Sequence, residues 1–236
     1  MTDHAIVSEE EWIEARKALL AKEKEFTRER DALSQARRDL PWVKVRKDYF
    51  FNTAQGRMSL ADLFEGRSQL LVYHFMFGPD WEKPCKSCSF WADNFNGISD
   101  HLKARDVSFA AVSRAPLGKL QAIAKRLGWN FRWISSSESD FNFDFGVSFK
   151  PEEITSGQVT YNFNDKHKAY GDEMPGISVF FRDKDGTIYR TYSCYARGLD
   201  MLNGAYHYLD LVPKGRDETG LPFSMAWVRL HDEYDA

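Results

Sequence analysis

The sequence predicts an α/β fold in which a central mixed β-sheet has helices on both faces. Two short apolar runs, at 70–77 and 107–112, are typical of buried strands. Each run is followed by a helical pattern, at 90–103 and at 116–127. A turn signal at 185–186 then separates two alternating segments and indicates a hairpin. Strands that alternate with helices and then form a hairpin favour one mixed sheet.

Residues 8–39 precede this domain and have the pattern of one long helix. Ser8 and Glu11 form a capping box, and Pro41 follows the helical residues. The apolar residues make a single stripe, formed by Trp12, Ala15, Leu19, Leu20, Phe26 and Leu33. A helix this polar needs a surface for its stripe. We therefore divide the chain into an N-terminal helical arm, 1–41, and a domain, 42–236. The stripe either packs on its own domain or forms a homodimer contact, and both alternatives stay open.

The other elements follow from local signals. The segment before the first apolar run contains a strand at 43–51, a turn at Gln55-Gly56 and a short helix that Ser59 caps and Gly66 closes. The later elements are a strand at 131–134, a loop with a short aromatic helix at 135–146, a polar insert near 148–172, two hairpin strands at 177–181 and 187–193, and a last helix at 198–210. The tail, 213–236, has no strong period.

Two cysteines separated by two residues follow the first apolar run. Cys85 lies where a helix is expected to start, and Pro84 suits a position just before that start. A thiol attacks disulfides only as its thiolate, and the unpaired N–H groups of a helix start favour the thiolate. We therefore interpret Cys85 as the attacking thiol and Cys88, one turn later, as the resolving thiol. Trp81 would form a wall of this site.

A second candidate lies after the next strand. The carboxyl ends of neighbouring parallel strands meet at one edge of a sheet, so Arg114 should lie at the same edge as Cys85. It could bind an anionic substrate or stabilise a thiolate, and the alternative is a solvated surface arginine. Cys194 is interpreted as a buried small apolar residue. Because no second CxxC and no HxxxH occurs, we expect no metal and no cofactor.

The composition limits the classes of function. The chain has 236 residues and a net charge of -3, so it has no basic excess for nucleic acid. No apolar run approaches the roughly 20 residues of a membrane span. The start has no basic and apolar segments of a secretion signal, and three cysteines are too few for a secreted disulfide framework. We therefore expect a cytoplasmic protein without membrane or nucleic-acid partners, whose CxxC is redox-active.

The order of elements and the motifs resemble the thioredoxin-like superfamily. Segment 50–77 is similar to the peroxiredoxin branch, whereas the CxxC with Trp81 ahead of it is nearer to thioredoxin. Pro175 matches the position of the cis-proline that faces the dithiol in that superfamily. More closely, LPWVKV, HFMFGPDW, CKSCSFWADNFNG, VSRAP, SDFNFDF, GRDE and MAWVRLHDEY resemble the bacterial domain-of-unknown-function family 899, over about residues 8–236. The resemblance implies a thioredoxin-like fold in which Pro175 presents backbone to the substrate.

These observations predict a thiol–disulfide oxidoreductase. Its partners would be a protein or small-molecule disulfide and an external reductant. One alternative is a thiol-dependent peroxidase of the peroxiredoxin type, although Lys83 stands near where that family has a hydroxyl residue. Another alternative is a non-enzymatic thioredoxin-fold protein that binds a partner, holds zinc or senses oxidants, because a fold does not determine a function.

Overall fold

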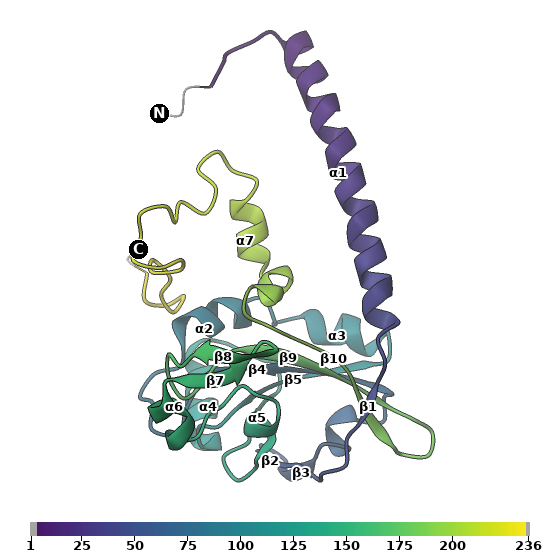
Figure 1. Ribbon diagram of the computed structural model, residues 1–236, viewed down its shortest axis with the longest axis vertical. Helices are drawn as coiled ribbons and strands as arrows, with labels where there is room; N and C mark the ends of the chain where they lie inside the picture. The colour runs from purple at the N-terminus through teal and green to yellow at the C-terminus, as the bar shows by residue number, and fades with distance from the viewer. Residues whose placement is uncertain (1–3, 235–236) are drawn as a thin grey trace. The chain divides into compact units, whose positions relative to one another are not determined.

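The computed structural model describes residues 4–234 of the chain (Figure 1), which divides between Pro41 and Trp42 into two compact units. The first unit consists of helix α1 (Glu9–Arg38). It begins at the predicted capping box, in which the backbone N–H of Glu11 donates to Ser8 Oγ over 3.2 Å and that of Ser8 donates to Glu11 Oε2 over 2.9 Å. The long N-terminal helix is therefore confirmed, and the homodimer contact of its stripe stays a prediction.

The second unit is built on a mixed sheet of eight strands, in the order β1-β10-β9-β4-β5-β6-β2-β3. These strands are β1 (Val43–Lys44), β2 (Phe50–Thr53), β3 (Gly56–Ser59), β4 (Gln69–His74), β5 (Val107–Ser113), β6 (Trp133–Ser135), β9 (Gly176–Arg182) and β10 (Ile188–Tyr195). The helices are η1 (Asp62–Phe64), α2 (Lys86–Ala92), α3 (Ile98–Lys103), α4 (Leu117–Arg126), α5 (Phe141–Asp144), α6 (Pro151–Ser156), η2 (Ala196–Leu202) and α7 (Gly204–Leu209). A separate two-stranded sheet holds β7 (Gln158–Tyr161) and β8 (Asn164–Lys168).

The centre of the sheet has the strand arrangement of a thioredoxin-like fold. Strand β4 runs parallel to β5 and antiparallel to β9, and β9 forms a hairpin with β10. The hairpin turns at Gly186, whose φ of 87° suits glycine. The predicted fold class is therefore confirmed.

Two cores lie on the two faces of the sheet because successive side chains of a strand point to opposite faces. Leu70 and Val72 of β4 join the core that contains η1 and α5. Tyr73 and, beyond the strand, Phe75 and Phe77 belong to the opposite core, with α2, α4 and η2. Figure 1 shows α2, α3 and α7 on one side of the sheet and α5 on the other. Tyr73 therefore points toward the face that α2 covers.

Three element predictions were wrong in their extent. The helix expected at 90–103 is divided into α2 and α3, because Gly97 adopts a φ of 83° between them. The strand expected at 43–51 is two strands, since β1 pairs with β10 whereas β2 pairs with β3 and β6. The helix expected at 198–210 is divided into η2 and α7, because Asn203 has an extended backbone between them and caps α7 with its side chain. The polar insert near 148–172 contains an antiparallel hairpin formed by β7 and β8.

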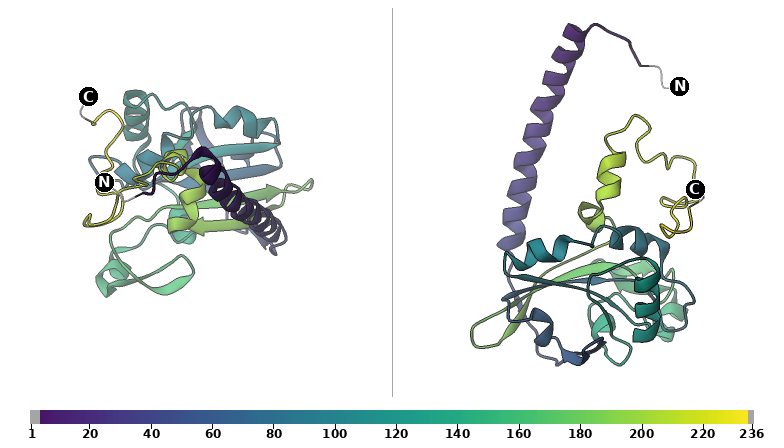
Figure 2. Two further views of the ribbon diagram at one scale, coloured as in Figure 1. Left: turned by 90° about the horizontal axis from the view of Figure 1, so that it is seen from above. Right: turned by 180° about the vertical axis from the view of Figure 1, so that it is seen from behind.

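The segment after α7 returns to the α2 end of the domain. It contains no helix or strand between 213 and 234, in agreement with its lack of period. Seen from behind, this yellow segment lies on the same side of the sheet as the yellow-green helix α7 (Figure 2). Lys86 Nζ of α2 donates to the carbonyl of Ala226 over 2.9 Å, so the segment contacts the helix that carries the dithiol.

Candidate active site

Strand β4 and helix α2 position the two cysteines of the CxxC. The loop from β4 is fixed by the N–H of Cys85, which donates to the carbonyl of Met76 over 3.1 Å. Cys85 is the N-cap of α2, directly after the buried Pro84, so the helix starts where the sequence predicted. The carbonyl of Cys85 accepts the N–H of Ser89 over 2.9 Å, which closes the first turn. Cys88 therefore lies one turn further along the same helix.

The two sulfur atoms are not bonded to each other but interact through a hydrogen bond. This bond to Cys88 is the main reason that the pKa of Cys85 is lowered to about 7. Burial raises this pKa, whereas the backbone N–H groups of Cys88 and Ser87 lower it further. Burial, followed by the neighbouring Cys85, raises the pKa of Cys88, whose side chain is 2% exposed. The pair is therefore asymmetric: Cys85 forms the thiolate and Cys88 holds the proton.

Tyr73 is a site residue that sequence reasoning missed. It lies on the α2 face of β4, and its hydroxyl and the N–H of Met76 both lower the pKa of Cys88 by hydrogen bonding, although burial outweighs them. The Met76 N–H lies 3.5 Å from the sulfur of Cys88. Burial raises the pKa of Tyr73 well above its usual value, so the phenol stays neutral and donates. The alternation of side chains along β4 predicts that Tyr73 lies on this face of the sheet. It does not predict that Tyr73 lies beside Cys88.

Trp81 and Arg114 meet at one acidic residue instead of at the sulfurs. Trp81 Nε1 donates to Asp172 Oδ1 over 3.2 Å, and Arg114 Nη2 lies 2.9 Å from Asp172 Oδ2. Arg114 Nε also pairs with Glu173, whose side chain is 1% exposed. Trp81 packs against the core that contains Cys85, as a wall residue would. Arg114 is 14% exposed and does not line the cavity next to the dithiol.

Glu173 is a buried acid in the loop before β9. Burial raises the pKa of its carboxyl to about 7, opposed by Arg114 and by Ser148. Ser148 Oγ donates to Glu173 Oε2 over 2.9 Å. The partners of Arg114 come from the polar insert, which the sequence did not connect with it.

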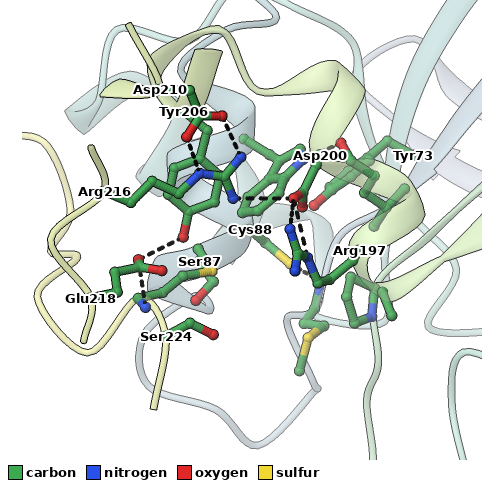
Figure 3. Close-up of a pocket in the computed structure, with 16 residues that line it drawn as sticks. Tyr73, Ser87, Cys88, Arg197, Asp200, Tyr206, Asp210, Arg216, Glu218 and Ser224 are labelled. Carbon is green, nitrogen blue, oxygen red and sulfur yellow. Dashed lines mark hydrogen bonds and ion pairs between the residues drawn. The ribbon is translucent and has the colours of Figure 1, made fainter. Parts of the chain in front are cut away.

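A cavity of about 550 Å³ opens beside Cys88 (Figure 3). Its lining comes from β4, α2, η2, α7 and the segment after α7, and includes Tyr73, Met76, Ser87, Cys88, Trp91, Pro175, Ala196, Arg197, Leu199, Asp200, Tyr206, Asp210, Arg216, Glu218, Ser224 and Met225. Cys85 is not in the lining, but its sulfur is hydrogen-bonded to that of Cys88. Most of these residues lie after 195, and although Arg216, Glu218 and Met225 belong to the motifs GRDE and MAWVRLHDEY, nothing in the sequence connected them with the dithiol.

Pro175 does lie on this cavity. Its carbonyl accepts the hydroxyl of Tyr161 over 2.6 Å. The peptide bond before it is trans, as are all peptide bonds in residues 4–234, which differs from the cis-proline of the superfamily that Pro175 matches in position.

Glu218 joins the segment after α7 to the rest of the site. Its Oε1 accepts the Tyr206 hydroxyl over 2.8 Å, the Trp227 indole N–H over 2.8 Å and the backbone N–H of Met225 over 2.9 Å. Met225 and Trp227 pack against the core to which Cys85 also belongs. This part of the chain therefore forms one wall of the cavity beside Cys88.

Residues 4–234 contain no group of three or more His, Cys, Asp or Glu side chains that could hold a metal ion. No helix among them is both long and apolar enough to cross a membrane.

Comparison with protein families gives one match over almost the entire chain. The family described as "Bacterial protein of unknown function (DUF899)" matches residues 1–234. The chain belongs to this family. The resemblance of its motifs to domain-of-unknown-function family 899 is therefore confirmed. A comparison with curated proteins finds no match.

Solved structures similar to this DUF899 member include a peroxidoxin and a peroxiredoxin. Peroxidoxin BcpB from Mycobacterium tuberculosis has 14% identity and a TM-score of 0.46, with 69% of this chain and 93% of that chain covered. Peroxiredoxin Q from Xanthomonas campestris has 16% identity and a TM-score of 0.40, with 66% and 87% covered.

Proposed function

We propose that this chain is a thiol–disulfide oxidoreductase in which Cys85 attacks a substrate disulfide and Cys88 resolves the product. The observation that carries the proposal is the placement of Cys85 at the N-cap of α2, with Cys88 one helical turn later. In this position the interaction with Cys88 lowers the pKa of Cys85 to about 7. About half of the Cys85 side chains would then be thiolate at neutral pH. Cys88, one turn away and buried, keeps its proton until it is needed.

The reaction consists of two exchanges. The Cys85 thiolate attacks one sulfur of the substrate, the S–S bond breaks, and the released thiolate takes up a proton. Cys88 then loses its proton and attacks the Cys85 sulfur of the mixed disulfide, and the second half of the substrate leaves as a thiol. The substrate gains two electrons and the dithiol becomes the Cys85–Cys88 disulfide. An external dithiol returns the protein to its reduced form.

The proposal is tested by removing the resolving thiol. Reduced Cys88→Ser, mixed with excess 2-hydroxyethyl disulfide, is expected to accumulate a mixed disulfide at Cys85, because the second exchange cannot occur. Intact mass and peptide mapping would measure one adduct per chain. Cys194→Ser is the matched control and should form the Cys85–Cys88 disulfide as the wild type does. An adduct found only at Cys88 or Cys194 in the single variants would contradict the assignment.

The lowered pKa also predicts a pH profile. Alkylation of Cys85 by iodoacetamide requires the thiolate, so its rate should rise with pH, reach half of its maximum near pH 7 and level off about one unit higher. In Cys88→Ala the midpoint should move to higher pH, because the hydrogen bond that contributes most is gone. Peptide-resolved alkylation rates between pH 5 and 10 would measure both profiles. Identical midpoints in the two proteins would show that Cys88 does not tune Cys85.

A further inference from the structure

The lining of the cavity beside Cys88 contains both apolar and charged side chains. Met76, Trp91, Leu199 and Met225 form the apolar part. The charged part contains two arginines and three carboxylates, which leaves an excess of one negative charge: Arg197, Arg216, Asp200, Asp210 and Glu218. A ligand that only carries negative charge is therefore repelled by this lining, and a ligand with an ammonium group is attracted.

Arg216 is part of the fixed wall. Its Nε and Nη2 each lie 2.8 Å from an oxygen of Asp210, and its Nη1 lies 3.2 Å from Asp200 Oδ2. The guanidinium also stacks on the ring of Tyr206 at 3.8 Å. All three guanidinium nitrogens of Arg216 are hydrogen-bonded, and two carboxylates neutralise its charge. Arg216 therefore stabilises the wall of the cavity and is not available to bind a ligand.

Arg197 has binding capacity left. Its Nη2 lies 3.2 Å from Asp200 Oδ2, and its side chain is 87% exposed. Asp200 is shared with Arg216, so it neutralises Arg197 only in part. A planar guanidinium at the mouth of a cavity suits a carboxylate group of a ligand.

Glu218 carries a negative charge in the lining of the same cavity. Burial raises the pKa of Glu218, but hydrogen bonds from Trp227, Tyr206 and Met225 together lower it below its usual value, so the carboxylate is charged at neutral pH. All three bonds reach Oε1, and Oε2 has no hydrogen bond from residues 4–234. In Figure 3, Arg197 and Glu218 lie at opposite sides of the view, with Cys88 between them.

We propose that the substrate of the dithiol is a small zwitterionic disulfide, held in this cavity with a carboxylate on Arg197 and an ammonium group facing Glu218. The inference rests on the proposed function. A cavity of about 550 Å³ is within the range that small ligands occupy. The segment after α7 bounds this cavity on one side through Arg216, Glu218 and Met225.

The test compares disulfides that share a core and differ in charge. Reduced wild-type protein is mixed with cystine (zwitterionic), cystamine (cationic), 3,3′-dithiodipropionate (anionic), 2-hydroxyethyl disulfide (neutral) or insulin, and formation of the Cys85–Cys88 disulfide gives a second-order rate constant. Each constant is divided by that of the same disulfide with dithiothreitol, because leaving groups differ in pKa. Cystine should exceed 2-hydroxyethyl disulfide by about tenfold or more, and dithiodipropionate should be the slowest small disulfide.

A substitution of Arg197, at the mouth of the cavity, tests its role in binding the carboxylate of the substrate. Arg197→Gln should lower the ratio of the cystine constant to the 2-hydroxyethyl disulfide constant by about tenfold. Arg105→Gln, an exposed arginine at the end of α3, is the matched control and should keep the wild-type ratio. Equal normalised constants for all small disulfides, or a larger constant for insulin, would overturn the inference and leave the proposed function standing. Failure of every disulfide to oxidise Cys85 and Cys88 would overturn both.

Discussion

Arg114→Met is expected to destabilise the domain by about 3–5 kcal/mol at pH 8, the cost of removing one partner from a buried ion pair. Arg114 pairs with Asp172 and Glu173, and the side chain of Glu173 is 1% exposed. Methionine keeps much of the length that packs over the ring of Phe143. The decrease in the free energy of unfolding therefore comes from the uncompensated charge of Glu173 rather than from a large cavity. Urea unfolding, followed by tryptophan fluorescence, measures it.

The effect of Arg114→Met should depend on pH in one direction. Burial raises the pKa of Glu173 to about 7 even with Arg114 beside it, and removal of the arginine raises that pKa further. A carboxyl whose pKa is raised by folding favours the folded state while it is protonated. That stability is present below the unfolded pKa near 4.5 and is lost as the pH rises through the folded value. The variant should therefore be closest to wild type at pH 5 and furthest from it at pH 8.

A second substitution distinguishes the effect of the buried charge of Glu173 from a general loss of packing. In Arg114→Met/Glu173→Gln the buried charge is absent, so most of the stability lost at pH 8 should return and the pH dependence should flatten. A loss of equal size at pH 5 and pH 8, without recovery in the double variant, would mean that Arg114 acts through packing alone.

Tyr73→Phe is expected to slow the second exchange by roughly 10- to 100-fold, since a hydrogen bond to a charged group contributes about 1.5–3 kcal/mol. When Cys85 is part of a mixed disulfide, Cys88 must ionise in a buried position. The hydroxyl of Tyr73 then supplies one of its hydrogen bonds, along with the N–H of Met76. Phenylalanine keeps the ring and removes this donor.

Rapid mixing with 2-hydroxyethyl disulfide, acid quenching and mass analysis would measure the lifetime of the mixed disulfide. In Tyr73→Phe the lifetime should increase, and the pH at which resolution becomes fast should move upward. Tyr195→Phe removes another buried phenol, which donates to the carbonyl of Phe145 over 3.1 Å, and serves as the control. Unchanged resolution in Tyr73→Phe would exclude its role in ionising Cys88.

The sequence predicted the parts of the fold that depend on neighbours along the chain. The apolar runs of β4 and β5, the turn at Gly186 and the capping box at Ser8 are local signals, and each element forms there. The position of Cys85 at a helix start followed from the same kind of reasoning. The division of the helix at Gly97 was missed because its apolar pattern continues through the glycine.

The parts of the site that were missed depend on residues far apart in the chain. Arg114 meets Glu173 only because the insert folds back to the edge of the sheet. The cavity takes one side from β4 and α2 and another from residues after 195, which no local period connects. Arg216 lies in the GRDE motif and pairs with Asp210, but its place on the cavity beside Cys88 comes from tertiary packing.

The segment after α7 is attached by two buried apolar residues, Val228 and Leu230, and by ion pairs at the surface of the domain. Arg126 pairs with Asp232 at 2.7 Å and Lys83 with Glu233 at 2.9 Å, and all four side chains are at least 30% exposed. Exposed pairs of this kind each contribute about 0–1 kcal/mol. Detaching the end of the chain would also expose Val228 and Leu230, at about 1.5–3 kcal/mol for each side chain. Ionic strength therefore acts on only part of the free energy that keeps this end of the chain in place.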